Sequence, residues 1–157
     1  MKQRLFILSQ YLLPHHLLSR LIGCIAECRI GWLKNPLISW FAKQYQVNMS
    51  EAQVEDLRAY EHFNAFFTRA LKDGARPLDE TPDAILSPAD GAISQLGAIE
   101  HGRIFQAKGH SFSAVELLGG DAERAAPFMG GQFATVYLSP KDYHRVHMPL
   151  GLSLIHI

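Results

Sequence analysis

The feature that most constrains the fold is a β-type run that leads directly into a cluster of acid/base side chains. Residues 133–138 read FATVYL, rich in the β-branched and aromatic residues that strands favour. Residues 139–142 read SPKD and predict a turn, because proline fixes φ and aspartate bonds to nearby backbone. His144 and His147 follow, beside a tyrosine and an arginine. The sequence thus predicts a strand that ends at a dense group of titratable side chains.

The relative direction of the two histidine side chains stays open at this point. In an extended segment His144 and His147 would face opposite sides, whereas in a helical turn they would share one face. Surface histidines beside a hairpin are the simplest alternative to an active site, because clustered titratable groups mark sites only statistically.

A second stretch places an acid at a tight turn. Residues 87–94 read SPADGAIS, so Asp90 lies between the apolar runs 84–86 and 92–93. Asp-Gly is a strong β-hairpin signal. A purely structural turn is therefore the simplest interpretation of Asp90 when it is taken alone.

The N-terminal region predicts helices with an apolar face and a basic charge. The apolar residues of one predicted helix recur on one face: Leu17, Leu18, Leu21, Ile22 and Ile25. Aromatic and basic residues then alternate as in interfacial segments: Trp32, Lys34, Trp40, Phe41 and Lys43. The net charge of the chain is zero, but residues 1–46 carry six Lys or Arg and one Glu. We therefore expect contact with an anionic membrane surface, in preference to helices that only cap the β core.

The middle of the chain predicts two further helices. Ser50 is a candidate N-cap for a helix that starts near residues 49–52. Residues 60–69 predict an aromatic-rich helix that ends at Gly74 and Pro77 and packs its phenylalanines into the core, with His62 at the surface.

From residue 85 onward the chain predicts short strands and turns. The exception is a short helix after Ser113, whose spacing to Glu116 fits a capping box. The predicted fold class is α+β: N-terminal amphipathic helices followed by a β-rich body that is incomplete at the C-terminus.

The composition argues against several classes of protein. A content of 48% hydrophobic and 19% charged residues over 157 residues is typical of a folded chain. The two cysteines have no second pair with which to complete a zinc site, so we expect no metal. The body is acidic and has no basic stripe, which argues against nucleic acid binding.

Three segments, read in order, resemble the bacterial-type phosphatidylserine decarboxylase proenzyme family: residues 87–97, 106–120 and 137–149. Residues 63–69 are similar to the family's Phe-Asn-x-Phe-Phe-x-Arg segment, and the resemblance extends over residues 1 to about 150. It implies an enzyme, a carboxy-lyase that converts phosphatidylserine into phosphatidylethanolamine. It also implies a peripheral location on the cytoplasmic side of the cell membrane.

The resemblance implies roles for three candidate catalytic residues. His147 would be the base that activates an internal serine for self-cleavage, and Asp90 would orient His147 and stabilise its imidazolium. His144 would act in substrate decarboxylation, as a proton donor or a phosphate contact. The cleaved serine would become a covalent pyruvoyl group, the electron sink that decarboxylation requires.

The serine itself is absent from this chain, because no serine follows a glycine and the family's cleavage site is a Gly-Ser pair. We expect residues 1–46 to be a membrane-associating region and residues 47–151 a truncated catalytic-domain fragment that lacks its C-terminal α-chain partner. Residues 152–157 read LSLIHI, which is the in-frame translation of a common transposase-end sequencing adapter, and we expect them to be an artefact. Such a fragment would be inactive alone.

Two other functions fit parts of the sequence. A non-catalytic membrane-binding β module would explain the basic amphipathic region of residues 1–46 and the missing nucleophile. A phosphocarrier-like β domain would use His147 as a phosphate acceptor, but it would leave the basic amphipathic region of residues 1–46 unexplained.

Overall fold

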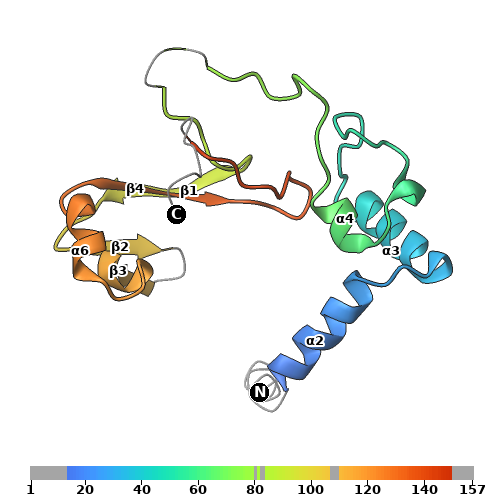
Figure 1. Cartoon of the computed structure of the whole chain (residues 1–157), viewed down its shortest axis with the longest axis horizontal. Helices are drawn as coiled ribbons and strands as arrows, with labels where there is room; N and C mark the ends of the chain where they lie inside the picture. The colour runs from blue at the N-terminus through green and yellow to red at the C-terminus, as the bar shows by residue number, and fades with distance from the viewer. Residues whose placement is uncertain (1–13, 80, 82–83, 107–109, 150–157) are drawn as a thin grey trace, which may run out of the picture. The chain divides into compact units, whose positions relative to one another are not determined.

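The computed structural model describes residues 14–79, 81, 84–106 and 110–149. The chain divides into two compact units, Met1–Glu80 and Thr81–Ile157, and each is described by itself (Figure 1). The described elements are, in chain order, α2 (His15–Ala26), α3 (Gly31–Gln44), η1 (Leu57–Ala59), α4 (Phe63–Phe67), β1 (Ala92–Ala98), β2 (Arg103–Gln106), β3 (His110–Ser113), α5 (Ala114–Leu117), α6 (Ala122–Ala125), η2 (Ala126–Phe128) and β4 (Gln132–Tyr137). The two longest described helices, α2 and α3, precede all the described strands, and the short helices α5 and α6 lie between β3 and β4. This mixture confirms the predicted α+β class. The apolar run at residues 5–13 and the tail at residues 152–157 lie outside the described residues.

The core of the first unit is built between α3 and α4. Ile38 and Phe66 are fully buried there, and Ala42 and Tyr60 complete the buried cluster. Phe41 was expected at a membrane interface, but its ring lies 5.0 Å from that of Phe63 and 6.1 Å from that of Phe66. This prediction was wrong because an aromatic ring on a helix also serves edge-to-face packing.

The two tryptophans of α3 differ from Phe41 in their surroundings. Trp32 is 77% exposed and Trp40 is 58% exposed. Lys34, predicted as an interfacial cation, instead donates from Nζ to the carbonyl oxygens of Arg58 (3.1 Å) and Tyr60 (2.6 Å). Its ammonium group therefore holds the segment around η1 against α3.

Helix α4 is shorter than the sequence predicts. It starts after His62, whose Nδ1 accepts a hydrogen bond from the Ala65 N–H (3.2 Å), and it ends before Thr68, well short of Gly74. The predicted surface position of His62 was wrong, because a helix N-terminus needs acceptors for its unpaired N–H groups. The predicted burial of the phenylalanines is confirmed by the ring contacts of Phe63 with Phe66 and Phe67.

The helix start predicted near Ser50 does not form. Residues 49–52 make a turn in which Asn48 Oδ1 accepts from the Ser50 N–H (3.1 Å), and Ala52 forms a β-bridge with Leu71. An Asx turn of this kind competes with helix formation for the same backbone groups.

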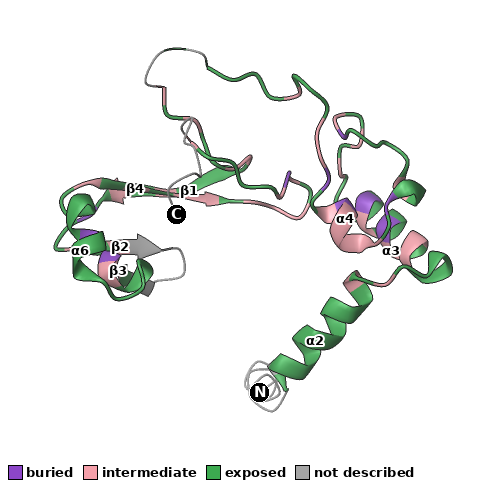
Figure 2. Cartoon of the chain, in the orientation of Figure 1, coloured by how far each residue is buried: buried purple, intermediate pink, exposed green. Residues whose placement is uncertain are grey.

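Helix α2 presents the predicted apolar face without a cover among the described residues. The five residues of this face, each 40–65% exposed, are Leu17, Leu18, Leu21, Ile22 and Ile25. Figure 2 shows nearly the whole helix as exposed. Its C-terminal end is tied to α4 through Glu27, whose carboxylate contacts His62 (3.5 Å) and Asn64. In the described part of the chain, no helix combines the length and hydrophobicity that a membrane span requires.

The second unit contains two separate antiparallel pairs. Strands β1 and β4 lie side by side as a ribbon (Figure 1), with Ala92 opposite Tyr137 and Ala98 opposite Gln132. A β-bulge interrupts the register between Ile93 and Gln95. The other pair is β2 with β3.

A capping box begins the helix after β3, as predicted. The Glu116 carboxylate accepts from the Ser113 N–H (3.0 Å) and hydroxyl (2.8 Å), while Ser113 Oγ accepts from the Glu116 N–H (3.0 Å). The two bonds donated by Ser113 hold the pKa of Glu116 below its usual value. The helix stops at Gly119 and Gly120, both with positive φ, as glycine C-caps allow.

Gly91 is required by the close approach of β4 to the start of β1. A Cβ atom at this position would lie 2.4 Å from the Tyr137 carbonyl oxygen and 3.0 Å from a Val136 methyl group. A carbonyl oxygen is part of the backbone, so relief of the clash requires the strands to separate.

We predict that Phe66→Ala lowers the free energy of unfolding of the first unit by about 3–5 kcal/mol, because it empties a fully buried site. Both tryptophans of the chain lie in this unit, so urea denaturation followed by tryptophan fluorescence measures it. Leu78→Ala is the matched control, since Leu78 is 70% exposed, and should change stability by less than about 0.5 kcal/mol. Equal losses for the two variants would contradict this core assignment.

We predict that Gly91→Ala separates the ends of β1 and β4 and destabilises the second unit by about 1–3 kcal/mol. Cross-strand nuclear Overhauser effects between Ala92 and Tyr137 should weaken or vanish. Gly23→Ala is the control, because nothing lies within 4 Å of a Cβ at that position. Unchanged Ala92–Tyr137 contacts in Gly91→Ala would show that the predicted clash is absent.

Candidate functional site

Two segments far apart in the sequence pair antiparallel beside the β1–β4 ribbon. Asp90 forms a β-bridge with Tyr143. The His147 N–H donates to the Pro88 carbonyl oxygen (2.8 Å), and the Leu86 N–H donates to that of Pro149 (2.9 Å). Residues 86–90 are thereby held against residues 143–149, which brings the segments of Asp90 and of both histidines together.

This pairing replaces the hairpin that Asp-Gly suggests. A hairpin at Asp90 would pair residues 84–86 with 92–93. Instead, β1 pairs with β4 and Leu86 bonds to Pro149. The hairpin that Asp-Gly predicts is therefore wrong, because strand partners from the far end of the unit compete successfully for the same backbone groups.

The turn between β4 and the histidines is confirmed, and its aspartate stabilises it. The Asp142 carboxylate accepts from the Ser139 N–H (2.7 Å) and hydroxyl (2.8 Å), and the Asp142 N–H donates to the Ser139 carbonyl (2.9 Å). The turn fixes the position at which Tyr143 starts to pair with Asp90.

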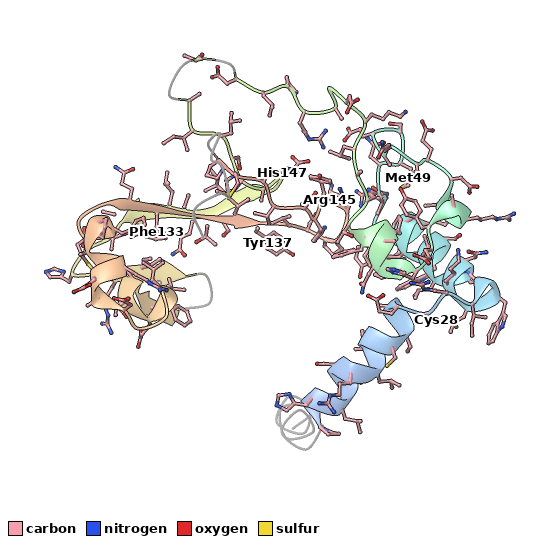
Figure 3. The ribbon with its side chains drawn as sticks, viewed as in Figure 1. Cys28, Met49, Phe133, Tyr137, Arg145 and His147 are labelled. Atoms are coloured by element: carbon pink, nitrogen blue, oxygen red, sulfur yellow. The ribbon has the colours of Figure 1, made fainter. Side chains whose placement is uncertain are left out.

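Tyr143 is the side chain that contacts His147. Its hydroxyl lies 2.9 Å from His147 Nε2, and the two rings stack with centroids 5.5 Å apart and planes inclined by 16°. Tyr143 is 9% exposed, whereas His147, labelled in Figure 3, is exposed. A buried ring thus holds an imidazole that remains accessible to a reacting group.

His144 has a different partner. Its Nδ1 lies 2.9 Å from the Asp142 carbonyl oxygen, and since a carbonyl only accepts, Nδ1 carries the proton and donates it. The nitrogen of His144 that can gain or lose a proton is therefore Nε2. Residues 143–149 form no helix, which excludes the helical turn as the arrangement of the two histidines.

Tyr143 stands beside the histidines in the sequence, but no local pattern indicates its role. The only sequence signal of its contact with His147 is the four-residue spacing between the two residues. That spacing can be interpreted only when the path of the backbone is known.

Asp90 is half-buried at the paired segment. In the described part of the chain, no three His, Cys, Asp or Glu side chains gather as a metal-binding group.

The arrangement can perform proton transfer. It presents an accessible imidazole with a hydrogen-bonded ring nitrogen, next to a segment that carries a carboxylate. A histidine oriented by neighbouring groups is the usual base for activating a hydroxyl nucleophile.

Comparisons with known proteins agree on one family. The family model described as phosphatidylserine decarboxylase matches residues 63–157, and a second model, described as PSD, matches residues 5–46. The chain is 90% identical over 154 residues to the phosphatidylserine decarboxylase proenzyme of Ectopseudomonas mendocina (strain ymp). It is 82% identical over the same length to proteins of that name from Pseudomonas fluorescens (strain Pf0-1) and Pseudomonas putida (strain KT2440).

The matches differ in how much of each protein they cover. They include 98% of this chain but 54% of each relative, so the chain spans about half the length of the curated relatives it matches. The family model alone covers more than half of the residues of this chain. The chain belongs to the phosphatidylserine decarboxylase family.

Proposed function

We propose that this chain is the N-terminal part of a phosphatidylserine decarboxylase proenzyme, which converts phosphatidylserine into phosphatidylethanolamine after self-cleavage. The observation that carries the proposal is the backbone pairing of residues 86–90 with 143–149. This pairing joins the two backbone segments that carry Asp90, His144 and His147, the residues to which the family resemblance gives roles, and so supports the proposal. The proenzyme names of the relatives support the maturation step.

In this proposal His147 accepts the proton of the attacking serine hydroxyl. The serine oxygen then bonds to the preceding carbonyl carbon, and the peptide bond is exchanged for an ester. Asp90 would hold the imidazole in the required tautomer and stabilise the imidazolium that forms. The half-buried position of Asp90 suits this role, because partial burial strengthens its attraction to a neighbouring imidazolium.

His144 is assigned to the later reaction of the lipid. With its Nδ1–H bonded to the Asp142 carbonyl, its Nε2 is the nitrogen that would carry a proton to the substrate or donate to its phosphate. The fixed Nδ1 contact supports this assignment, because it sets the orientation of the ring before substrate arrives.

The cofactor of the proposal is a pyruvoyl group made from the serine. When present it supplies an electron sink for the carbanion left by decarboxylation. This chain has no Gly-Ser pair from which the group could form, but the acid/base groups described above fit a site that receives such a serine from elsewhere.

The partner would be the C-terminal α-chain, and the β1–β4 ribbon is a surface suited to it. The bulge in β1 puts Ile93 and Leu96 on one face, because they pair with Val136 and Ala134, which share a face of β4. Ile93 is 65% exposed and Leu96 is 66% exposed. A two-stranded ribbon is marginal by itself in water, so further strands would stabilise it by covering this face.

The test of the enzymatic proposal is a hybrid proenzyme, in which residues 1–149 of this chain are followed by the remainder of the Ectopseudomonas mendocina relative. We expect the hybrid to cleave itself into two subunits. His147→Gln and Asp90→Asn should each slow cleavage by roughly 10²- to 10⁴-fold, since a positioned base supplies that much. Mass analysis over time measures the cleavage, and decarboxylation of phosphatidylserine measures the activity.

His144 and a control complete this experiment. His144→Gln should leave cleavage intact and abolish decarboxylation, which separates its role from that of His147. The exposed His16 of α2 provides the matched control, and His16→Gln should cleave normally. Cleavage at an unchanged rate in His147→Gln would refute the assignment of the base.

The proposed location is the membrane surface on the cytoplasmic side, where α2 would lie with its apolar face among the lipids. The support is the exposed row of leucine and isoleucine side chains together with the exposed Trp32 and Trp40. Basic residues in the same region would attract anionic headgroups.

We predict that Leu21→Glu weakens binding of the chain to vesicles that contain an anionic phospholipid by about tenfold or more, because a buried leucine contributes about 1.5–3 kcal/mol. Leu78→Glu, at a 70% exposed position outside α2, adds the same charge and should have little effect. Co-sedimentation measures both variants. Equal binding by the two would argue against α2 as the contact surface.

The two alternatives from the sequence make different predictions. A phosphocarrier would form a phosphohistidine at His147, but the chain matches the decarboxylase family instead. A non-catalytic membrane module would bind vesicles, but the hybrid proenzyme that contains it would not cleave itself.

A further inference from the structure

The contact between Tyr143 and His147 has a chemical consequence beyond packing. The phenol oxygen lies 2.9 Å from Nε2 in a nearly parallel ring stack. Both residues are also fixed through their backbones, Tyr143 by its bridge to Asp90 and His147 by its bond to Pro88. The hydroxyl is therefore aimed at one particular nitrogen of the imidazole.

The direction of this hydrogen bond follows from acidity. A neutral imidazole has one N–H donor and one acceptor nitrogen, and either nitrogen can be the donor. A phenol O–H is a much stronger acid than a neutral imidazole N–H, which favours the phenol as the donor and Nε2 as the acceptor. With that direction, the ring proton of a neutral His147 is on Nδ1.

We propose that Tyr143 is a positioning residue that selects the Nδ1–H tautomer of His147 before self-cleavage. This inference rests on the proposed role of His147 as the base. In a Ser-His-Asp arrangement, Nδ1–H donates to the carboxylate and Nε2 accepts the proton of the nucleophile. Tyr143 imposes that same tautomer without the serine.

The buried position of Tyr143 beside His147 suits this role. In this chain the Tyr143 hydroxyl donates a hydrogen bond to Nε2. The attacking serine hydroxyl would replace it as the donor to the same nitrogen. The serine proton goes to Nε2, and Tyr143 gains and loses no proton in the step. The stacked ring keeps the imidazole plane fixed during the exchange of partners.

The first test is the tautomer of His147 in this chain, read from ¹⁵N chemical shifts of the imidazole nitrogens at a pH where the ring is neutral. The chain with Tyr143 should show a protonated Nδ1 and an unprotonated Nε2. Tyr143→Phe keeps the stacked ring and removes only the hydroxyl, so the proton should move toward Nε2. Tyr45→Phe removes a hydroxyl from the first unit and should change nothing. An unchanged tautomer in Tyr143→Phe, or a protonated Nε2 in the parent chain, would overturn the proposal.

The second test is the rate of self-cleavage in the hybrid proenzyme. Tyr143→Phe should slow it roughly ten- to a hundredfold, a loss of the size seen when the hydrogen-bond partner that orients a metal-bound histidine is removed. Tyr45→Phe should cleave at the parent rate. Unchanged or faster cleavage in Tyr143→Phe would show that the hydroxyl does not assist the base, and the proposal would fall.

The two readouts keep the proposals distinguishable. If the parent hybrid does not cleave, the proposed enzymatic function fails, while the tautomer measurement still decides whether Tyr143 controls His147. If the hybrid cleaves and the tautomer is insensitive to Tyr143, only the positioning role fails.

Discussion

The second unit depends on the backbone hydrogen bonds between residues 86–90 and 143–149. These bonds join the entry to β1 with the exit from β4, so the same pairing that closes the ribbon also brings together the backbone segments of Asp90 and the two histidines. Gly91 permits the approach, because any side chain there would meet the Tyr137 carbonyl. The ribbon and the proposed site thus depend on one backbone pairing, and a change that separates the two segments would disturb both.

Each unit also exposes apolar side chains of the kind that a folded protein usually buries in its core. In the first unit they lie along α2, and in the second they lie on the ribbon at Ile93 and Leu96. Large exposed apolar surfaces indicate interaction sites. The two surfaces differ in kind: a helix with basic neighbours suits a lipid surface, whereas a ribbon with open edges suits further strands.

The sequence predicts what local patterns determine, and it fails where a distant partner decides. Helix α2 and the strand at Phe133 follow from periodicity and composition, and the burial of Phe66 follows from its aromatic surroundings. The Asp-Gly turn was misjudged because its strand partners lie some fifty residues away. The helix at Ser50 was lost to an Asx turn and to the β-bridge of Ala52 with the distant Leu71. The candidate site residues came from a family resemblance, and no propensity argument could have supplied the contact of Tyr143 with His147.

Hydrogen exchange at two backbone amides tests the account most directly. The His147 and Leu86 amides donate to the Pro88 and Pro149 carbonyl oxygens in the pairing that joins the two segments of the proposed site. In the 157-residue chain, both amides should exchange far more slowly than those of an unstructured peptide, because each is held in a hydrogen bond. Exchange of both at the unstructured rate would contradict the central claim, since the site would then not be assembled in this chain.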